Sequence, residues 1–124
     1  MVHSHLLLIT FFQLLLLSTS LARSQTFVDL RNDLPNNTKA QLNLRCGKGS
    51  DFYLKLGDHL NNSLTLDQDF VCNAAWSRWF TTWDAYHAER DKDHHIVYWS
   101  VRKDGFYHSW DGSKWNLLEG WHTE

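Results

Sequence analysis

Hydrophobic and polar residues alternate with a repeat of two along most of the chain after residue 25. This alternation predicts short β-strands that each bury one face. In the strand predicted over residues 96–102, for example, Val97, Trp99 and Val101 share a face. The other predicted strands cover residues 26–30, 41–46, 52–56, 64–66, 70–76, 78–88 and 106–110. No segment after residue 25 has an extended apolar stripe at helical spacing, so the predicted fold class is all-β.

Turn residues separate these strands. Asp104-Gly105 and Asp111-Gly112 each follow an aromatic strand segment, and an Asp-Gly pair favours a tight hairpin because both residues tolerate positive φ. About seven to eight short strands joined in this way are typical of a sandwich or a barrel. We predict a small antiparallel β-sandwich that occupies residues 25–124 as a single domain.

Residues 1–24 follow a different pattern. Residues 6–17 are almost purely apolar, and small residues follow them, which is typical of a cleaved secretory signal peptide. Cleavage could follow Ala22 or Ser24. The alternative is a membrane anchor, but an apolar run of about 12 residues is too short to cross roughly 30 Å of hydrocarbon. We therefore expect a soluble, secreted, extracellular protein.

Secretion changes how the two cysteines and two glycosylation sequons are interpreted. In an oxidising compartment Cys46 and Cys72 are expected to form one internal disulfide, the alternative being two buried free thiols. Both lie on apolar strand faces, so the bridge could join strands across the core. The sequons at Asn36 and Asn61 are candidate glycosylation sites, and each lies in a polar stretch that is predicted to form a turn.

Composition excludes several classes of protein. A chain of 124 residues is expected to form one domain, and its formal charge of -2 gives no support to nucleic-acid binding through phosphate neutralisation. Two cysteines are too few for a four-cysteine zinc site. Aromatic residues make up 15% of the chain, and all seven tryptophans lie between Trp76 and Trp121.

One charged run joins two of the aromatic strands, and we predict that it is a partner-binding loop. Loops on a rigid sandwich commonly carry recognition surfaces, and mixed charges favour specificity. The alternative is a merely solvated loop. The histidines and aspartates of this run could ligate a metal only if the run forms an irregular loop, because adjacent side chains on a strand point to opposite faces. We therefore expect no metal or other cofactor. The loop consists of Glu89, Arg90, Asp91, Lys92, Asp93, His94 and His95.

Two other functions compete with partner binding. An acid–base pair for catalysis could be built from His87 and His108, but nothing in their spacing indicates one, so we expect no enzyme. Exposed aromatic rings can stack on sugars, and Trp110, Trp115 and Trp121 flank a turn and the tail. The second candidate function is therefore an extracellular carbohydrate-binding or defence protein.

Four segments resemble the plant self-incompatibility proteins and their secreted homologues. They are the opening strand at residues 27–34, the cysteine strand at 42–46, the Phe-x-Cys strand with a following tryptophan at 70–76, and the Trp-x-Val-x-x-Asp-Gly hairpin at 99–107. The resemblance covers essentially the whole chain after residue 25.

The resemblance implies a small secreted β-sandwich with an internal disulfide and an extracellular signalling or recognition role in a plant. The best understood relatives act in the pistil, where pollen recognises them. The expected partner is a plasma-membrane receptor or a cell-wall component, and the expected state is a monomer. Many members have a second cysteine pair where this chain has Val97 and Tyr107, so a second bridge is impossible here.

Overall fold

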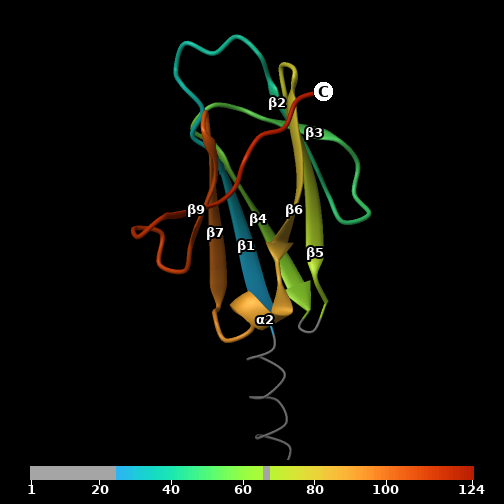
Figure 1. Ribbon diagram of the computed structural model, residues 1–124. Helices are drawn as coiled ribbons and strands as arrows, with labels where there is room; N and C mark the ends of the chain where they lie inside the picture. Colours follow the sequence, from blue (N-terminus) through green and yellow to red (C-terminus); the bar gives the residue numbers. More distant parts are fainter. Residues whose placement is uncertain (1–24, 66–67) are drawn as a thin grey trace, which may run out of the picture.

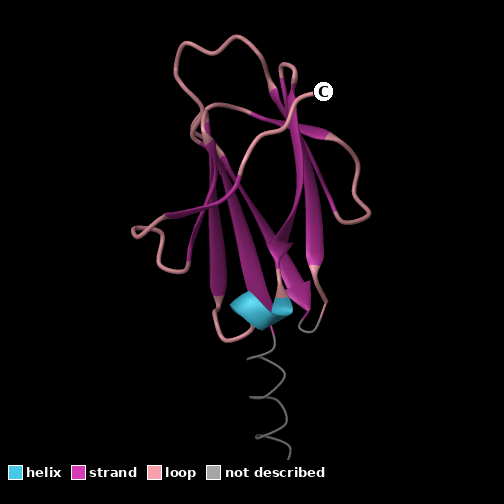
Figure 2. Cartoon of the chain, in the orientation of Figure 1, coloured by secondary structure: helices cyan, strands magenta, loops and turns pink. Residues whose placement is uncertain are grey.

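The computed structural model describes residues 25–65 and 68–124, which form two packed β-sheets (Figures 1 and 2). The predicted signal peptide at residues 1–24 lies outside the described residues, as does Leu66 of one predicted strand. The five-stranded sheet has the order β4 (His59–Thr65), β1 (Gln25–Asn32), β7 (Ile96–Arg102), β8 (Gly105–Ser109), β9 (Asn116–Glu119). The four-stranded sheet has the order β3 (Phe52–Leu54), β2 (Leu42–Cys46), β5 (Phe70–Trp76), β6 (Trp79–Tyr86). The all-β sandwich is confirmed, and the described helix, α2 (Ala88–Asp91), has a single turn.

The core fills the space between the two sheets, and alternation along each strand creates it. Val28 and Leu30 of β1 and Val97, Trp99 and Val101 of β7 are all fully buried. Leucines and tryptophans of the opposite sheet face them, so the predicted inward faces of these strands are correct.

The central strand pair differs from the prediction. β1 pairs antiparallel with β4 but parallel with β7, with Phe27 opposite Ile96. Alternation identifies the buried face of a strand but not the direction of its neighbour, so sequence periodicity could not reveal a parallel pair.

Two predicted hairpins form, but with different turns. Arg102 pairs with Gly105, so the β7–β8 turn consists of Lys103 and Asp104, and neither has positive φ. Gly105 is needed for another reason: a Cβ there would lie 2.4 Å from the backbone oxygen of Glu119 on β9. The predicted tight turn at Asp111-Gly112 is wrong, because residues 110–115 form a longer loop between β8 and β9.

The predicted disulfide is confirmed, but its path is not the one expected. Cys46 and Cys72 lie directly opposite each other on the adjacent strands β2 and β5, with their Cα atoms 4.1 Å apart. The bridge faces the core yet joins two strands of the same sheet, because the β2–β5 register makes the cysteines cross-strand partners.

Three strand details escaped the sequence analysis. β4 begins at His59 and β9 adds a further strand, because polar side chains are acceptable on the outer strands of a sheet. A bulge near the end of β6 breaks its alternation, so that Tyr86 lies in the core whereas Phe80 is exposed.

The segment after β9 crosses from one sheet to the other (Figure 1). The indole of Trp121 packs 4.6 Å from the ring of Phe106, and its Nε1 donates to the backbone oxygen of Arg102 at 2.8 Å. One residue later, His122 exchanges two backbone hydrogen bonds with Phe80 on β6. The segment therefore closes one side of the sandwich.

Candidate functional site

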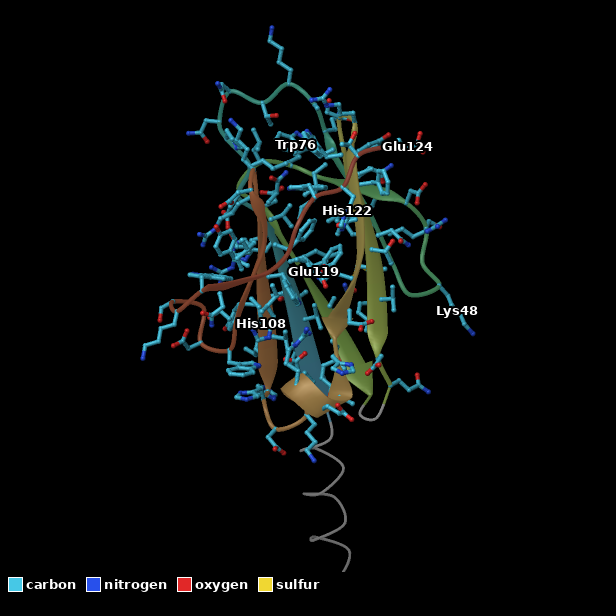
Figure 3. The ribbon with its side chains drawn as sticks, viewed as in Figure 1. Lys48, Trp76, His108, Glu119, His122 and Glu124 are labelled. Atoms are coloured by element: carbon cyan, nitrogen blue, oxygen red, sulfur yellow. A yellow bond between two sulfur atoms is a disulfide. The ribbon has the colours of Figure 1, made fainter. Side chains whose placement is uncertain are left out.

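Four histidines and the whole predicted loop lie at the end of the sandwich that carries α2. The site, which we call the α2 end, consists of residues 86–95 and 108–115. Phe27 at the start of β1 donates its backbone N–H to His95, whereas Asn32 at the other end of that strand bonds to the 57–58 turn. Figure 3 labels His108 in the half of the sandwich near α2 and Trp76 near the opposite end.

A buried carboxylate organises this end. Asp91 is fully buried, and it accepts hydrogen bonds from Arg90 Nη2 at 2.6 Å, His108 Nε2 at 3.0 Å and Trp110 Nε1 at 3.0 Å. The backbone N–H of His87 also donates to it at 3.0 Å. Burial alone would raise the pKa of Asp91, but the hydrogen bonds from His108 and Arg90 outweigh burial and hold that pKa well below its ordinary value. Asp91 is therefore ionised at neutral pH.

The predicted partner-binding loop is thus only partly available to a partner. The prediction that Asp91 contacts a partner is wrong, because the Asp91 side chain is buried inside the protein. Arg90 is also committed: it pairs with Asp91, donates to the backbone oxygen of Asp84 at 2.9 Å, and lies 5.2 Å from the ring of Trp99. The members that remain exposed are Glu89, Lys92, Asp93 and His95, while His94 is half-buried.

The half-buried His94 has an aromatic partner that the sequence analysis did not assign to it. Its ring stacks on Trp110, with centroids 4.1 Å apart and an angle of 5° between the planes. Trp110 remains 45% exposed and borders a groove of about 470 Å³ that His94, His108 and Lys114 also line. The sequence does not predict this pairing, because His94 and Trp110 belong to different segments and nothing local indicates that they meet.

The loop that carries Trp110 is held in shape by Asp111. Its carboxylate accepts from the backbone N–H groups of Lys114 at 2.9 Å and Ser113 at 2.8 Å, and from the Ser109 hydroxyl at 2.9 Å. The same backbone hydrogen bonds hold the pKa of Asp111 well below its ordinary value. Asp side chains favour turns because they accept hydrogen bonds from backbone N–H groups two or three residues later. Asp111 by itself therefore predicts the loop at residues 110–115 better than the Asp111-Gly112 pair, which predicts a tight turn.

The alternative that the histidines of this loop ligate a metal gains no support from the structure. His94 stacks on Trp110, whereas the ring of His95 packs edge-on against Phe27 at 5.4 Å, so the two histidines engage different neighbours. The described residues that could share a cation are instead Asp69, Asp84 and His87. The His87 ring lies within hydrogen-bonding distance of Asp69, so these contacts give no independent evidence for a cation.

This second cluster supports the start of α2. His87 Nδ1 lies 3.2 Å from Asp69 Oδ2 and 4.0 Å from Asp84 Oδ2. Asp69 also accepts the backbone N–H of Ala88 at 2.9 Å, and that hydrogen bond lowers the pKa of Asp69 below its ordinary value. His87 is therefore engaged with carboxylates, and the structure gives no support to an acid–base pair with His108.

The two sequons occupy different settings. Asn36 lies in an exposed turn, as predicted, whereas Asn61 lies exposed within the edge strand β4 and not in a turn. Of the tryptophans proposed to stack on sugars, Trp115 contacts two guanidinium groups, with the ring centroid 5.6 Å from the guanidinium carbon of Arg31 and 5.5 Å from that of Arg102. These contacts leave Trp110 as the member of that group with the most open ring.

Comparisons with known proteins agree on the fold. The family model described as plant self-incompatibility protein S1 matches residues 27–121. A solved structure from plants, described as a self-incompatibility protein homologue, aligns with a TM-score of 0.59 and 19% identity, covering 81% of this chain and 96% of that chain. No curated protein sequence matches. Among the described residues, no helix is long and apolar enough to cross a membrane.

Proposed function

The chain belongs to the plant self-incompatibility protein S1 family, and from this membership we propose that it is a secreted plant protein that acts by binding a partner at the cell surface. The solved homologue is described as one of a family of small, highly stable, secreted proteins, which supports secretion. We propose a binding role and not catalysis, since Asp91 and His108 are both used to hold the α2 end together.

The observation that carries the proposal is the exposed surface of the α2 end. Glu89, Lys92 and Asp93 project charge of both signs from a short segment anchored through the buried Asp91. Beside them, His94 and Trp110 form a flat aromatic pair. A fixed loop loses little conformational entropy on binding, and mixed charge gives specificity for a complementary partner.

The proposal is tested by binding of the labelled mature chain to plant cells, including pollen, with excess unlabelled chain as competitor. The variant combines Glu89→Gln, Lys92→Gln and Asp93→Asn. We expect saturable binding that this variant weakens at least tenfold while its thermal unfolding is unchanged. Parallel samples with soluble cell-wall glycans separate a protein receptor from a wall component, and saturable binding to pollen would support a role in pollen–pistil recognition.

A matched control changes three exposed charges at the opposite end of the sandwich. Lys55→Gln and Asp58→Asn lie at the 57–58 turn and Glu124→Gln lies at the same end of the sandwich (Figure 3), so this control also removes two acidic charges and one basic charge. Equal loss of binding in both triple variants would attribute binding to overall charge. Full binding by the α2-end variant would remove this loop from the recognition surface.

Processing is part of the same proposal. We expect mass spectrometry of the secreted chain to place its first residue at Arg23 or Gln25, after cleavage behind Ala22 or Ser24. Enzymatic removal of N-linked glycans should reduce its mass, and Asn36→Gln and Asn61→Gln assign the loss to each sequon. Retention of residues 1–24 in the secreted protein would contradict the signal-peptide assignment.

A further inference from the structure

The outer face of the four-stranded sheet carries a hollow of about 330 Å³ that the proposed function does not use. Side chains that alternate away from the core line it, and they come from β2, β5 and β6, with Asp51 from the segment before β3. The face lies on a different sheet from Trp110 and its groove. The outward-facing residues are Asn43, Arg45, Asn73, Ala75, Phe80 and Thr82.

Two exposed aromatic rings stand at the two edges of this sheet in one row. The register places Tyr53 opposite Asn43, Asn43 opposite Ala75, and Ala75 opposite Phe80. Tyr53 is 63% exposed and Phe80 is 44% exposed. Three interstrand steps separate their backbones by about 14 Å, so two small side chains lie between two aromatic walls. The row is thus a shallow depression between two aromatic rings, and an elongated ligand could lie in it across the strands.

The position of one wall is fixed by the C-terminal segment. Phe80 exchanges two backbone hydrogen bonds with His122, and the two rings lie 6.5 Å apart. An exposed apolar ring that is held by its neighbours offers contact area at little cost in entropy.

The floor of the hollow offers hydrogen bonds without net charge. The Thr82 hydroxyl donates to Asn73 Oδ1 at 2.5 Å, which leaves the Asn73 amide hydrogens directed elsewhere. No described residue donates to or accepts from the side-chain amide of Asn43. Arg45 has an acidic neighbour, with its Nε 3.8 Å from Asp51, so the charges on this floor balance. Such a surface is matched to a ligand that is polar but uncharged.

We propose that this face binds a neutral oligosaccharide. A chain of sugar rings presents apolar C–H faces, which stack on aromatic walls, and hydroxyl groups, which exchange hydrogen bonds with amides such as those of Asn43 and Asn73. An acidic polymer would need unpaired cations, and Arg45 is paired. The site lies apart from the α2 end, so the inference does not depend on the proposed receptor-binding function.

Calorimetric titration of the mature chain with cellohexaose, xylohexaose and mannohexaose tests this inference, with a galacturonic acid hexamer as the anionic comparison. We expect at least one neutral hexamer to bind with a dissociation constant of roughly 1 mM or tighter. Amide chemical-shift changes should centre on Asn43, Asn73, Ala75 and Thr82. Tyr53→Ala and Phe80→Ala should each weaken binding about five- to tenfold.

Two controls keep the test decisive. Tyr53→Phe keeps the ring and should retain binding, and Leu117→Ala removes an exposed apolar side chain from the other sheet and should bind as the wild type does. Unchanged thermal unfolding of each variant excludes a folding effect. The inference is overturned if no neutral hexamer binds, if only the galacturonic acid hexamer binds, or if the shifts centre on Trp110.

Discussion

Replacing Asp91 with asparagine tests the central claim that a buried carboxylate holds the α2 end together. The substitution keeps the size of the side chain but places an NH₂ group among donors from Arg90, His87, His108 and Trp110. Breaking a buried charge pair typically costs about 3–5 kcal/mol, because the remaining charge loses its compensation. A domain of this size has about 5–15 kcal/mol in total, so we expect a large fraction of the free energy of unfolding to disappear.

The assay is equilibrium urea unfolding of the mature chain, followed by tryptophan fluorescence. Asp93→Asn is the matched control: it is the same chemical change two residues away at an exposed position, and we expect it to alter the free energy of unfolding by less than about 0.5 kcal/mol. The reasoning is refuted if Asp91→Asn costs no more than Asp93→Asn at neutral pH.

The pH dependence has a defined sign. The folded-state pKa of Asp91 lies below its unfolded value of about 3.9, so the folded state retains the charge to lower pH than the unfolded state does. The stabilisation is complete above that unfolded value and is lost as pH falls toward the folded pKa. The difference between wild type and Asp91→Asn should therefore be constant from pH 7 to about 5 and shrink below pH 4. A constant difference down to pH 2 would contradict this assignment.

Three further predictions concern the core and the sheets. Trp99→Phe should lower the free energy of unfolding in urea by about 1–3 kcal/mol more than Trp83→Phe does. The reason is that Trp99 donates to the backbone oxygen of Ala85 at 2.7 Å, whereas Trp83 Nε1 has no hydrogen-bond partner among the described residues. Equal losses in the two variants would contradict this. Reducing the disulfide should lower the free energy of unfolding by roughly 3.5 kcal/mol for its 26-residue loop, and a urea midpoint that stays fixed after verified thiol release would refute that. Gly105→Ala should lower the melting temperature by several degrees because the new Cβ meets the backbone of Glu119. The control is Gly57→Ala: Gly57 also has positive φ, but the space around it is open, so this variant reports the backbone strain without the clash.

Local pattern was sufficient to predict much of the fold. The inward positions of Val97 and Trp99, the strand ends at Cys46 and Trp76, and the disulfide all follow from alternation and from the chemistry of a secreted chain. These features depend on neighbours a few residues away, or on a partner whose identity is forced because the chain has two cysteines. The family resemblance supplied the same fold independently.

Features that depend on distant partners could not be predicted. The stacking of His94 on Trp110 and the hydrogen bond from His108 to Asp91 join segments whose proximity follows from the sheet order β1-β7-β8. In the sequence, Asp91 was one of five charged residues in a row, and nothing local distinguished the one that would be buried. Burial of a charge is decided by the donors that tertiary structure brings to it.

The parallel pairing of β1 with β7 has a consequence for how the chain matures. β1 is among the first described residues to be synthesised, yet its partner on one side is made about 70 residues later, which at ordinary translation rates takes roughly 4–14 s. β4 can cover the other edge of β1 earlier, so during this interval one edge of the central strand exposes unpaired backbone groups. Substitutions that weaken β7 should consequently reduce the yield of secreted protein more than they reduce the binding activity of the molecules that do leave the cell.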